Sequence, residues 1–399
     1  MLKSNNSKLI FHIDMNTFFC SVEEIRNPSL RGKAFAVGRE GTLKGVLSTA
    51  SYEARKYGIH SAMPIIEAYH KLPSLIVVNG HYSEYKKYHE MFMKIIYRYT
   101  DKVEVASIDE CYCDMTHWIE QKHPIVLAKE IQAAILTEVG LKCSIGIAPT
   151  LFLAKMASDM QKPLGLVVLR KRDVKEKLYP LSVKDIFGIG KKTYPRLIEN
   201  GILTIGDFMN PNNKELIVDL IGENQYNYAY SHINGNSTNI VDPDRYADSQ
   251  SISTSQTFDV FKIDPEELVY ESRGMIRSVI KRLKYDNYLC KTIILTLRDS
   301  DFVTISRRKT LNEYTDDFYV ISDVIIDLIN EYFISGKSYR LLGVGLSNLV
   351  KKDDLPKEYN LFTVMDKNEK EFIINDMVND FKRKFGDSII KWKGDKNGK

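Results

Sequence analysis

The spacing of apolar and polar residues divides the chain into an α/β part, an all-helical part and a second α/β part. In the first part, the pattern predicts strands at 9–14, 34–51, 103–115 (a hairpin), 143–148 and 165–169, and helices at 16–24, 52–59, 81–99, 125–139 and 151–160. Because strands and helices alternate irregularly, with a hairpin among them, the pattern predicts an α+β domain.

The pattern changes after Ser182. It predicts only helices from there to about Ile233, and the polar, turn-rich stretch 234–245 predicts a linker. The order that follows is strand, helix, strand, strand, helix and strand, at 251–258, 264–285, 291–299, 302–310, 316–334 and 340–349. This βαββαβ order is typical of a compact ferredoxin-like unit. Residues 351–399 form a charged tail in which apolar residues recur at helical spacing.

Composition narrows the class of protein. The chain has 399 residues, of which 44% are hydrophobic and 27% charged, as is typical of a globular protein with several domains. No apolar run approaches the roughly 20 residues of a membrane-spanning helix, and no signal-peptide core is visible, so we expect a cytoplasmic protein without a membrane partner. The net charge of +4 permits an anionic partner without requiring one.

The five cysteines do not predict a disulfide framework, because their number is odd and their spacing irregular. Cys111 and Cys113 would share one face of a strand, but the sequence offers no two further ligands at a compatible spacing. We therefore interpret them as small core residues rather than as metal ligands.

Two adjacent acids, Asp109 and Glu110, lie within VEVASIDECYCDM. Neighbours on a regular strand point to opposite faces, but a hairpin tip or a bulge would let both side chains converge. A third acid, Asp14, ends the first predicted strand. Three carboxylates are hard oxygen ligands suited to Mg²⁺ or Mn²⁺, and two such ions can support an in-line displacement at phosphate. Taken alone, however, two acids at a hairpin tip are more often simply solvated.

Four motifs in order make a wider pattern: HIDMNTFFCSVEE, STASYEARKYGI, ASIDE and SDMQKPLG. Together they strongly resemble the Y-family of DNA polymerases, in its DinB/UmuC (DNA polymerase IV-like) group, over essentially the whole chain. The resemblance implies a right-hand fold with a ferredoxin-like palm (1–16 and 81–170), small fingers (17–80), a helical thumb with a helix-hairpin-helix (171–233), a linker (234–245), a βαββαβ little finger (246–350) and a tail (351–399). It implies a template-directed, low-fidelity DNA polymerase that extends a primer 3′-hydroxyl with deoxynucleoside triphosphates and does not proofread.

The resemblance also assigns residues to the active site. Asp14, Asp109 and Glu110, with the backbone carbonyl of Met15, would hold two Mg²⁺ ions, with Mn²⁺ as a possible substitute. The nucleotide would contact Phe18, Phe19, Thr49, Tyr52, Arg55 and Lys162, with Phe19 as the steric gate against ribonucleotides. Without the four motifs, Phe19 would be interpreted as a core aromatic residue, and Tyr52 and Arg55 as a fortuitous pair on a surface helix.

DNA contacts are expected in two places. In FGIGKK, Gly188, Gly190 and Lys191 would let a helix-hairpin-helix approach a DNA phosphate, although Pro195 leaves the start of the second helix open. In the last domain, Arg298, Arg307, Arg308 and Lys309 are candidates for phosphate contacts. The alternatives are a plain helix turn and a solvated charged face.

The tail contains EYNLF (358–362), which resembles the peptide that docks bacterial polymerases on the sliding clamp. Leu361 and Phe362 would be its anchors, and Glu358 in place of the usual Gln would weaken binding; a plain linker is the alternative. We expect a monomer in the bacterial cytoplasm that acts at the nucleoid.

The small residues Val46 and Ser48 predict a roomy site around the nascent base pair, and hence synthesis past damaged bases. Two other functions are alternatives to a polymerase. A non-catalytic clamp- and DNA-binding scaffold would not need the three acids, and a two-metal nuclease would not release pyrophosphate.

Overall fold

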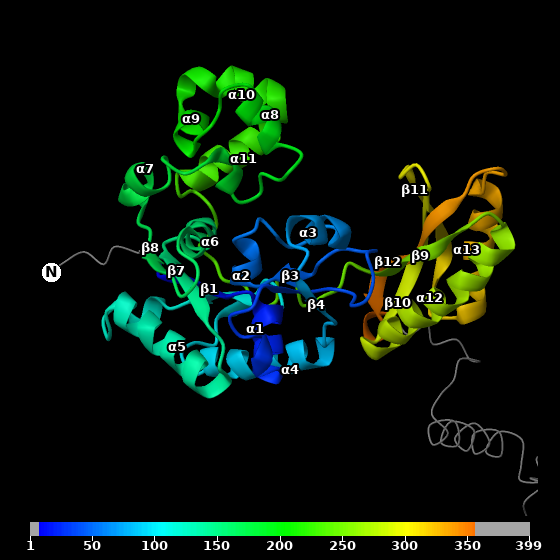
Figure 1. The fold of residues 1–399 in the computed structure, drawn as a ribbon, viewed down its shortest axis with the longest axis horizontal. Coiled ribbons are helices and arrows are strands. Elements are labelled where there is room, and N and C mark those ends of the chain that lie inside the picture. Colours follow the sequence, from blue (N-terminus) through cyan, green and yellow to red (C-terminus); the bar gives the residue numbers. More distant parts are fainter. Residues whose placement is uncertain (1–7, 356–399) are drawn as a thin grey trace, which may run out of the picture. The chain divides into compact units, whose positions relative to one another are not determined.

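The computed structural model describes residues 8–355. These residues divide into two compact units, with the boundary between Asp248 and Ser249. Figure 1 shows the elements of both units along the chain. Short 3₁₀ helices connect several of the elements: η1 Pro28–Leu30, η2 Thr116–Trp118, η3 Lys171–Asp173, η4 Val183–Asp185, η5 Pro211–Asn213 and η6 Lys352–Asp354.

The first unit is built on a five-stranded sheet in the order β5-β6-β1-β7-β8. The strands are β1 Ile10–Met15, β5 Val103–Val105, β6 Glu110–Asp114, β7 Cys143–Ala148 and β8 Leu166–Val168. The central strand β1 runs antiparallel to β6 and β7, whereas β7 and β8 are parallel. The predicted hairpin at 103–115 is thus present as β5 and β6.

Alternation along β1 divides its side chains between two layers. Phe11, Ile13 and Met15 pack into a core with α4 (Tyr82–Ile96) and α5 (Pro124–Val139). Ile10 faces the other layer, which is formed by α6 (Leu151–Met160). Gly146 on β7 lets α6 approach closely, because a Cβ at this position would lie 2.0 Å from the carbonyl oxygen of Ala154. The acids of the candidate site lie on this α6 side.

A smaller sheet in the order β3-β2-β4 contains β2 Phe35–Val37, β3 Thr49–Ala50 and β4 Ile76–Val78. It is accompanied by α1 Phe18–Arg26, α2 Tyr52–Arg55 and α3 Ile65–Lys71. The hydrophobic pattern does not predict α3 or β4, and α2 is shorter than the predicted helix at 52–59. The chain turns after Arg55, and Gly58 adopts a left-handed φ of +74°.

The helical part follows with α7 Val174–Lys177, α8 Tyr194–Glu199, α9 Ile205–Met209, α10 Lys214–Ile221 and α11 Glu223–Ile233. Its apolar residues share one core with α6. Pro195 is the second residue of α8, where a proline is tolerated because the first helical N–H groups have no intrahelical partner.

The predicted linker is anchored to the five-stranded sheet through Glu104 on β5. This carboxylate is buried, and its Oε2 accepts a hydrogen bond from Asp242 N at 3.0 Å. Its Oε1 forms an ion pair with Arg245, at 2.7 Å from Nε. Val241 is buried in the core shared with α6. The linker is therefore held against the first unit up to Arg245.

The second unit has the predicted βαββαβ order: β9 Ser251–Lys262, α12 Pro265–Tyr285, β10 Tyr288–Asp299, β11 Thr304–Thr315, α13 Phe318–Tyr332 and β12 Tyr339–Lys351. The strands form an antiparallel sheet in the order β11-β10-β12-β9. Ile293, Leu295 and Leu297 of β10 pack against the two helices. The intervening residues of β10 lie on the uncovered face.

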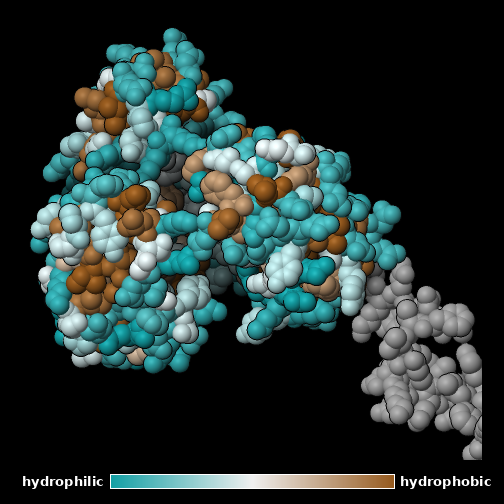
Figure 2. Space-filling model, turned by 45° about the vertical axis from the view of Figure 1, so that its right-hand side comes forward, coloured by the Kyte–Doolittle hydropathy of each residue, from teal (hydrophilic) through white to brown (hydrophobic). Residues whose placement is uncertain are grey.

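Two predictions from composition can be compared with the described residues. All five cysteines are buried with free thiols, as the core interpretation requires. Among residues 8–355, no helix is long and apolar enough to span a membrane. The face shown in Figure 2 is mostly hydrophilic, with separate hydrophobic patches.

Candidate active site

Three acids lie at one end of the central strands of the five-stranded sheet. Asp14 on β1 pairs in register with Glu110, the first residue of β6. Asp109 precedes β6 in the hairpin connection, and its carbonyl oxygen accepts a hydrogen bond from Met15 N at 2.9 Å. The hairpin thus brings the two adjacent acids to Asp14, as the sequence predicted.

Two lysines from the α6 region hold these carboxylates. Lys155 Nζ lies 2.6 Å from Glu110 Oε2 and 3.4 Å from Asp14 Oδ2, and its side chain is only 12% exposed. Lys162 Nζ lies 3.0 Å from Asp14 Oδ2 and 2.8 Å from Asp159 Oδ1. Lys155 and Asp159 were not predicted. Their i, i+4 spacing is the signal that could have found them, because it places two charges on one face of an apolar helix, close before Lys162.

His12 is a further residue that the sequence analysis missed. It is fully buried on the same face of β1 as Asp14, two positions away, and its ring lies 4.6 Å from that of Tyr112. Nδ1 is 2.8 Å from Ser158 Oγ, and Nε2 is 3.3 Å from Glu110 Oε2 without making a hydrogen bond. The i, i+2 spacing in HID was a usable signal.

The surroundings move the pKa values of two acids in opposite directions. Burial alone would raise the pKa of Glu110, but the Lys155 ammonium, 2.6 Å from Oε2, outweighs burial and lowers the pKa below its usual value of 4.5. Burial raises the pKa of Asp109, and the hydrogen bond from Ser107 Oγ, at 2.6 Å, offsets this only in part. Asp14 and Glu110 add to the rise. Asp109 has no ion pair with any residue in 8–355, so it is a half-buried carboxylate suited to an added cation.

The two phenylalanines after the first strand have different surroundings. Phe19 is partly exposed, and its ring stacks on Tyr85 with centroids 4.2 Å apart. Glu23 fixes Tyr85 by accepting its hydroxyl hydrogen at 2.6 Å. Phe18 is 2% exposed and packs in the core with Phe92. The Phe18 side chain therefore packs into the core of the first unit, and its contact with the nucleotide stays a prediction.

The predicted triphosphate residues lie at the start of α2. Thr49 is buried on β3, and Arg55 Nε donates to the Ala50 carbonyl at 3.0 Å. The Arg55 guanidinium lies 5.7 Å from the centroid of the Tyr52 ring. Burial raises the pKa of Tyr52, and the negative charge of Asp14 adds to this rise. The positive charges of Arg55 and Lys162 act in the opposite direction and lower the pKa. Tyr52, Lys162 and the acids therefore belong to one electrostatic neighbourhood.

The predicted helix-hairpin-helix has η4 and α8 on either side of its turn. Gly188 adopts a φ of +92°, which glycine reaches without strain, and Gly190 and Lys191 are exposed. The first element is a single 3₁₀ turn rather than an α-helix.

The basic run on β11 is divided between the two faces of the four-stranded sheet. Arg307 lies opposite Leu295 in the strand register, and its guanidinium carbon is 4.8 Å from the centroid of the Tyr332 ring of α13. Lys309 forms an ion pair with Asp327 of the same helix, with Nζ 3.1 Å from Oδ2. Arg308 pairs with Ile294 and faces the uncovered side. Arg298 faces the same side, because it lies four positions along β10 from Ile294. Arg307 therefore lies on the helix side of the sheet, and its phosphate contact stays a prediction.

On the same face as Arg308, Gly343 and Gly345 of β12 lie beside Ser255 and Ser253 of β9, so the side chains along these two strands are small.

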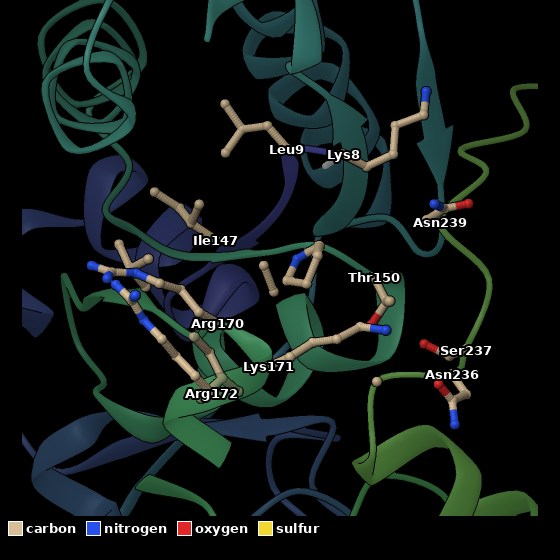
Figure 3. Close-up of a pocket in the computed structure, with 15 residues that line it drawn as sticks. Lys8, Leu9, Ile147, Thr150, Arg170, Lys171, Arg172, Asn236, Ser237 and Asn239 are labelled. Carbon is tan, nitrogen blue, oxygen red and sulfur yellow. The ribbon is translucent and has the colours of Figure 1, made fainter. Parts of the chain in front are cut away.

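A separate cavity of about 920 Å³ lies at the opposite end of β1 and is lined by Lys8, Arg170, Lys171 and Arg172, among others (Figure 3). Two acids lie beside these four cations. Lys8 pairs with Asp114 at 2.6 Å, and both arginines lie 3.8 Å from Asp173. The cavity is separate from the acidic cluster.

The predicted clamp peptide, with Leu361 and Phe362, lies outside the described residues.

Comparison with known proteins agrees with this arrangement. The chain matches the impB/mucB/samB family over residues 13–159 and the C-terminal domain of that family over residues 249–358. It is 39% identical over 400 residues to DNA polymerase IV of Oceanobacillus iheyensis, covering 99% of this chain and 94% of that protein. It is 37% identical over 390 residues to DNA polymerase IV 1 of Bacillus subtilis, covering 96% and 92%.

Solved structures give the same class. A Y-family DNA polymerase chimera of Dbh and Dpo4 matches with a TM-score of 0.75 and 29% identity, covering 86% of this chain and 99% of that chain. DinB from Sulfolobus solfataricus matches with a TM-score of 0.58, at the same identity and coverage. The chain therefore belongs to the impB/mucB/samB family, and its fold is that of the Y-family DNA polymerases.

Proposed function

We propose that this protein is a template-directed DNA polymerase that adds deoxynucleotides to a primer 3′-hydroxyl with low fidelity and without proofreading. The main observation in support of this proposal is the cluster of Asp14, Asp109 and Glu110 at the end of the central strands. The relatives named DNA polymerase IV support the same reaction. A scaffold is not favoured, because it would have no need to bury these acids.

The residues fit divalent cations. Asp14, Asp109, Glu110 and the Met15 carbonyl supply hard oxygen ligands, and Asp109 is a half-buried carboxylate without a cationic partner in the described part of the chain. Two Mg²⁺ ions, or Mn²⁺ in their place, would activate the attacking hydroxyl and stabilise the leaving phosphate oxygen. Lys155 and Lys162 hold the carboxylates together in the absence of metal.

For the nucleotide, we assign Phe19 as the steric gate, with its ring held by Tyr85. Thr49, Tyr52, Arg55 and Lys162 bind the triphosphate, since Arg and Lys suit phosphate oxygens and the Tyr hydroxyl can donate to them. The exposed, modest side chains of Val46 and Ser48 support a roomy site and hence synthesis past damaged bases.

The domain division follows from the same proposal. The five-stranded sheet is the palm (1–16 and 81–170), the three-stranded sheet lies in the fingers (17–80), and the thumb is 171–233. The linker is 234–245 and the little finger 246–350. Primer–template DNA would contact Gly188, Gly190 and Lys191 of the thumb, and Arg298 and Arg308 on the uncovered face of the little finger.

The remaining partners rest on the sequence. Residues 358–362 would dock on the bacterial sliding clamp, with Glu358 weakening the contact. We place the protein as a monomer in the bacterial cytoplasm, at the nucleoid when it acts, which the bacterial relatives support.

The test is primer extension on an undamaged primer–template with Mg²⁺ and all four deoxynucleotides. Asp109→Ala should lower the single-turnover rate by more than about 100-fold, because losing a metal ligand exceeds the 10–100-fold cost of losing an outer partner. DNA binding by the variant should be retained. Extension that survives the substitution, or a wild-type protein that binds DNA without extending it, would contradict the proposal.

A further inference from the structure

The acidic cluster contains one buried ring nitrogen that no hydrogen bond accounts for. His12 is 0% exposed, and its Nε2 has no hydrogen-bond partner among the described residues. Ligand atoms of His12, Asp14 and Glu110 all lie within 4.8 Å of one another. Because buried polar atoms are almost always paired, this nitrogen points to a ligand.

Neighbouring hydrogen bonds place the lone pair of His12 on Nε2. The Ser158 hydroxyl donates its one hydrogen to the Lys155 carbonyl oxygen at 2.8 Å, so Ser158 Oγ must accept from His12 Nδ1, also at 2.8 Å. Nε2 therefore turns a lone pair toward Glu110 Oε2, 3.3 Å away. Facing lone pairs repel unless a cation binds both. A histidine whose other nitrogen is fixed by a hydrogen bond is the usual arrangement of a metal ligand.

The separation of these two atoms matches a tetrahedral ion. Bonds of roughly 2.0–2.1 Å from zinc to nitrogen and oxygen, at the tetrahedral angle, place two ligand atoms about 3.3 Å apart. Imidazole suits zinc and similar ions, whereas Mg²⁺ prefers oxygen. We propose that His12 Nε2, Asp14 and Glu110 form a site for an imidazole-binding divalent transition-metal ion such as Zn²⁺. This ion inhibits primer extension, because it occupies two carboxylates assigned to Mg²⁺.

The site differs from the proposed Mg²⁺ site in two respects. It uses His12, and it does not need Asp109, whose carboxylate is outside the group of close ligand atoms. Lys155, whose ammonium lies 2.6 Å from Glu110 Oε2, is the cation that Zn²⁺ replaces. The inhibition rests on the proposed function, whereas the zinc binding does not.

Zinc affinity is measured by competition with a chromophoric chelator at neutral pH, without DNA or nucleotide. The wild type should bind one Zn²⁺ per chain at this site. His12→Gln should weaken binding at least about tenfold. His117→Gln, which removes an exposed histidine, should leave the affinity unchanged. The Mg²⁺ dependence of primer extension should change much less in His12→Gln, because the oxygen ligands remain.

Two further variants complete the test. Asp109→Ala should retain zinc binding. Ser158→Ala removes the hydrogen-bond acceptor that orients the His12 ring, so it should weaken zinc binding. This variant provides the test if circular dichroism shows that His12→Gln is not folded.

Four outcomes would overturn the proposal: wild-type protein without stoichiometric zinc, unchanged zinc affinity in a folded His12→Gln, unchanged affinity in Ser158→Ala, or loss of zinc from Asp109→Ala. Zinc binding without primer extension would overturn the proposed function and leave the zinc site standing.

Discussion

The two larger sheets carry their charged residues in opposite ways. On the five-stranded sheet, Asp14 and Glu110 are packed under α6 and paired with a lysine that is 12% exposed. On the four-stranded sheet, Arg298 and Arg308 lie on the face opposite to α12 and α13. The first arrangement fixes a few charges in one geometry, and the second spreads charge over a surface.

The difference follows from what each sheet has to do. Charges that are close together and shielded from water interact strongly and depend on one another, so removing one affects the rest. Exposed charges are screened and nearly independent. Substitutions should therefore have large, metal-dependent effects on the first sheet and small, salt-dependent effects on the second.

The largest effect is expected from Lys155→Met. Without the ammonium, two neighbouring carboxylates lose their shared partner, and the free energy of unfolding in EDTA should fall by about 3 kcal/mol, as for other broken buried pairs. Zn²⁺ or Mn²⁺ should bind more tightly, because no internal cation has to leave. Urea unfolding and metal titration measure the two effects.

The matched control is Lys122→Met. Lys122 also lies 2.6 Å from a carboxylate, that of Glu130, but the two side chains of this pair are 32% and 43% exposed. Its loss should cost less than about 1 kcal/mol and leave metal affinity unchanged. Equal destabilisation by the two substitutions would remove the distinction between buried and exposed charge.

An intermediate effect is expected from Glu110→Gln in acid. The pKa of Glu110 is lowered below 4.5 in the folded protein, so as the pH falls below about 4.5 the unfolded chain takes up this proton before the folded chain does. Wild-type stability should fall as the pH falls through this range. The variant should show a shallower fall, by up to about 1.4 kcal/mol per pH unit. Unfolding curves in EDTA at a series of pH values measure the slopes, and parallel slopes would contradict the assignment.

The smallest effects are expected on the four-stranded sheet. Arg308→Ala should weaken DNA binding by several-fold and reduce the dependence of log K on log salt by about one unit, as for one lost phosphate contact. Arg307→Ala, on the helix side, should change both quantities less. Fluorescence anisotropy at several salt concentrations compares the two. A larger effect from Arg307 would mean that the helix side of the edge strand carries the contact.

Much of the fold is predictable from contiguous patterns. The predicted strand at 143–148 and helix at 151–160 coincide with β7 and α6, because an unbroken apolar run and a helical repeat are each bounded by polar or turn residues. Elements α3 and β4 were missed, since short segments carry few periodic positions. The order of the four-stranded unit was predicted in full.

The candidate site was predictable only in part. Asp14, Asp109 and Glu110 carry a local signal at strand ends. Lys155 belongs to the site only because Gly146 brings α6 against the sheet, which is a tertiary contact. The faces of Arg307 and Arg308 depend on the register of β11 with β10, and the sequence of one strand does not contain that register.

The ion pair between Glu104 and Arg245 sets the length of the free linker between the two units. Only three residues, 246–248, separate Arg245 from the start of the second unit, a span of at most about 10 Å. Releasing the contacts from Asp242 onward would more than double the number of linking residues. Effective concentration falls roughly as the −3/2 power of tether length, so the second unit would be about threefold less concentrated around DNA held by the first. One buried carboxylate on β5 thus acts on processivity through chain length alone.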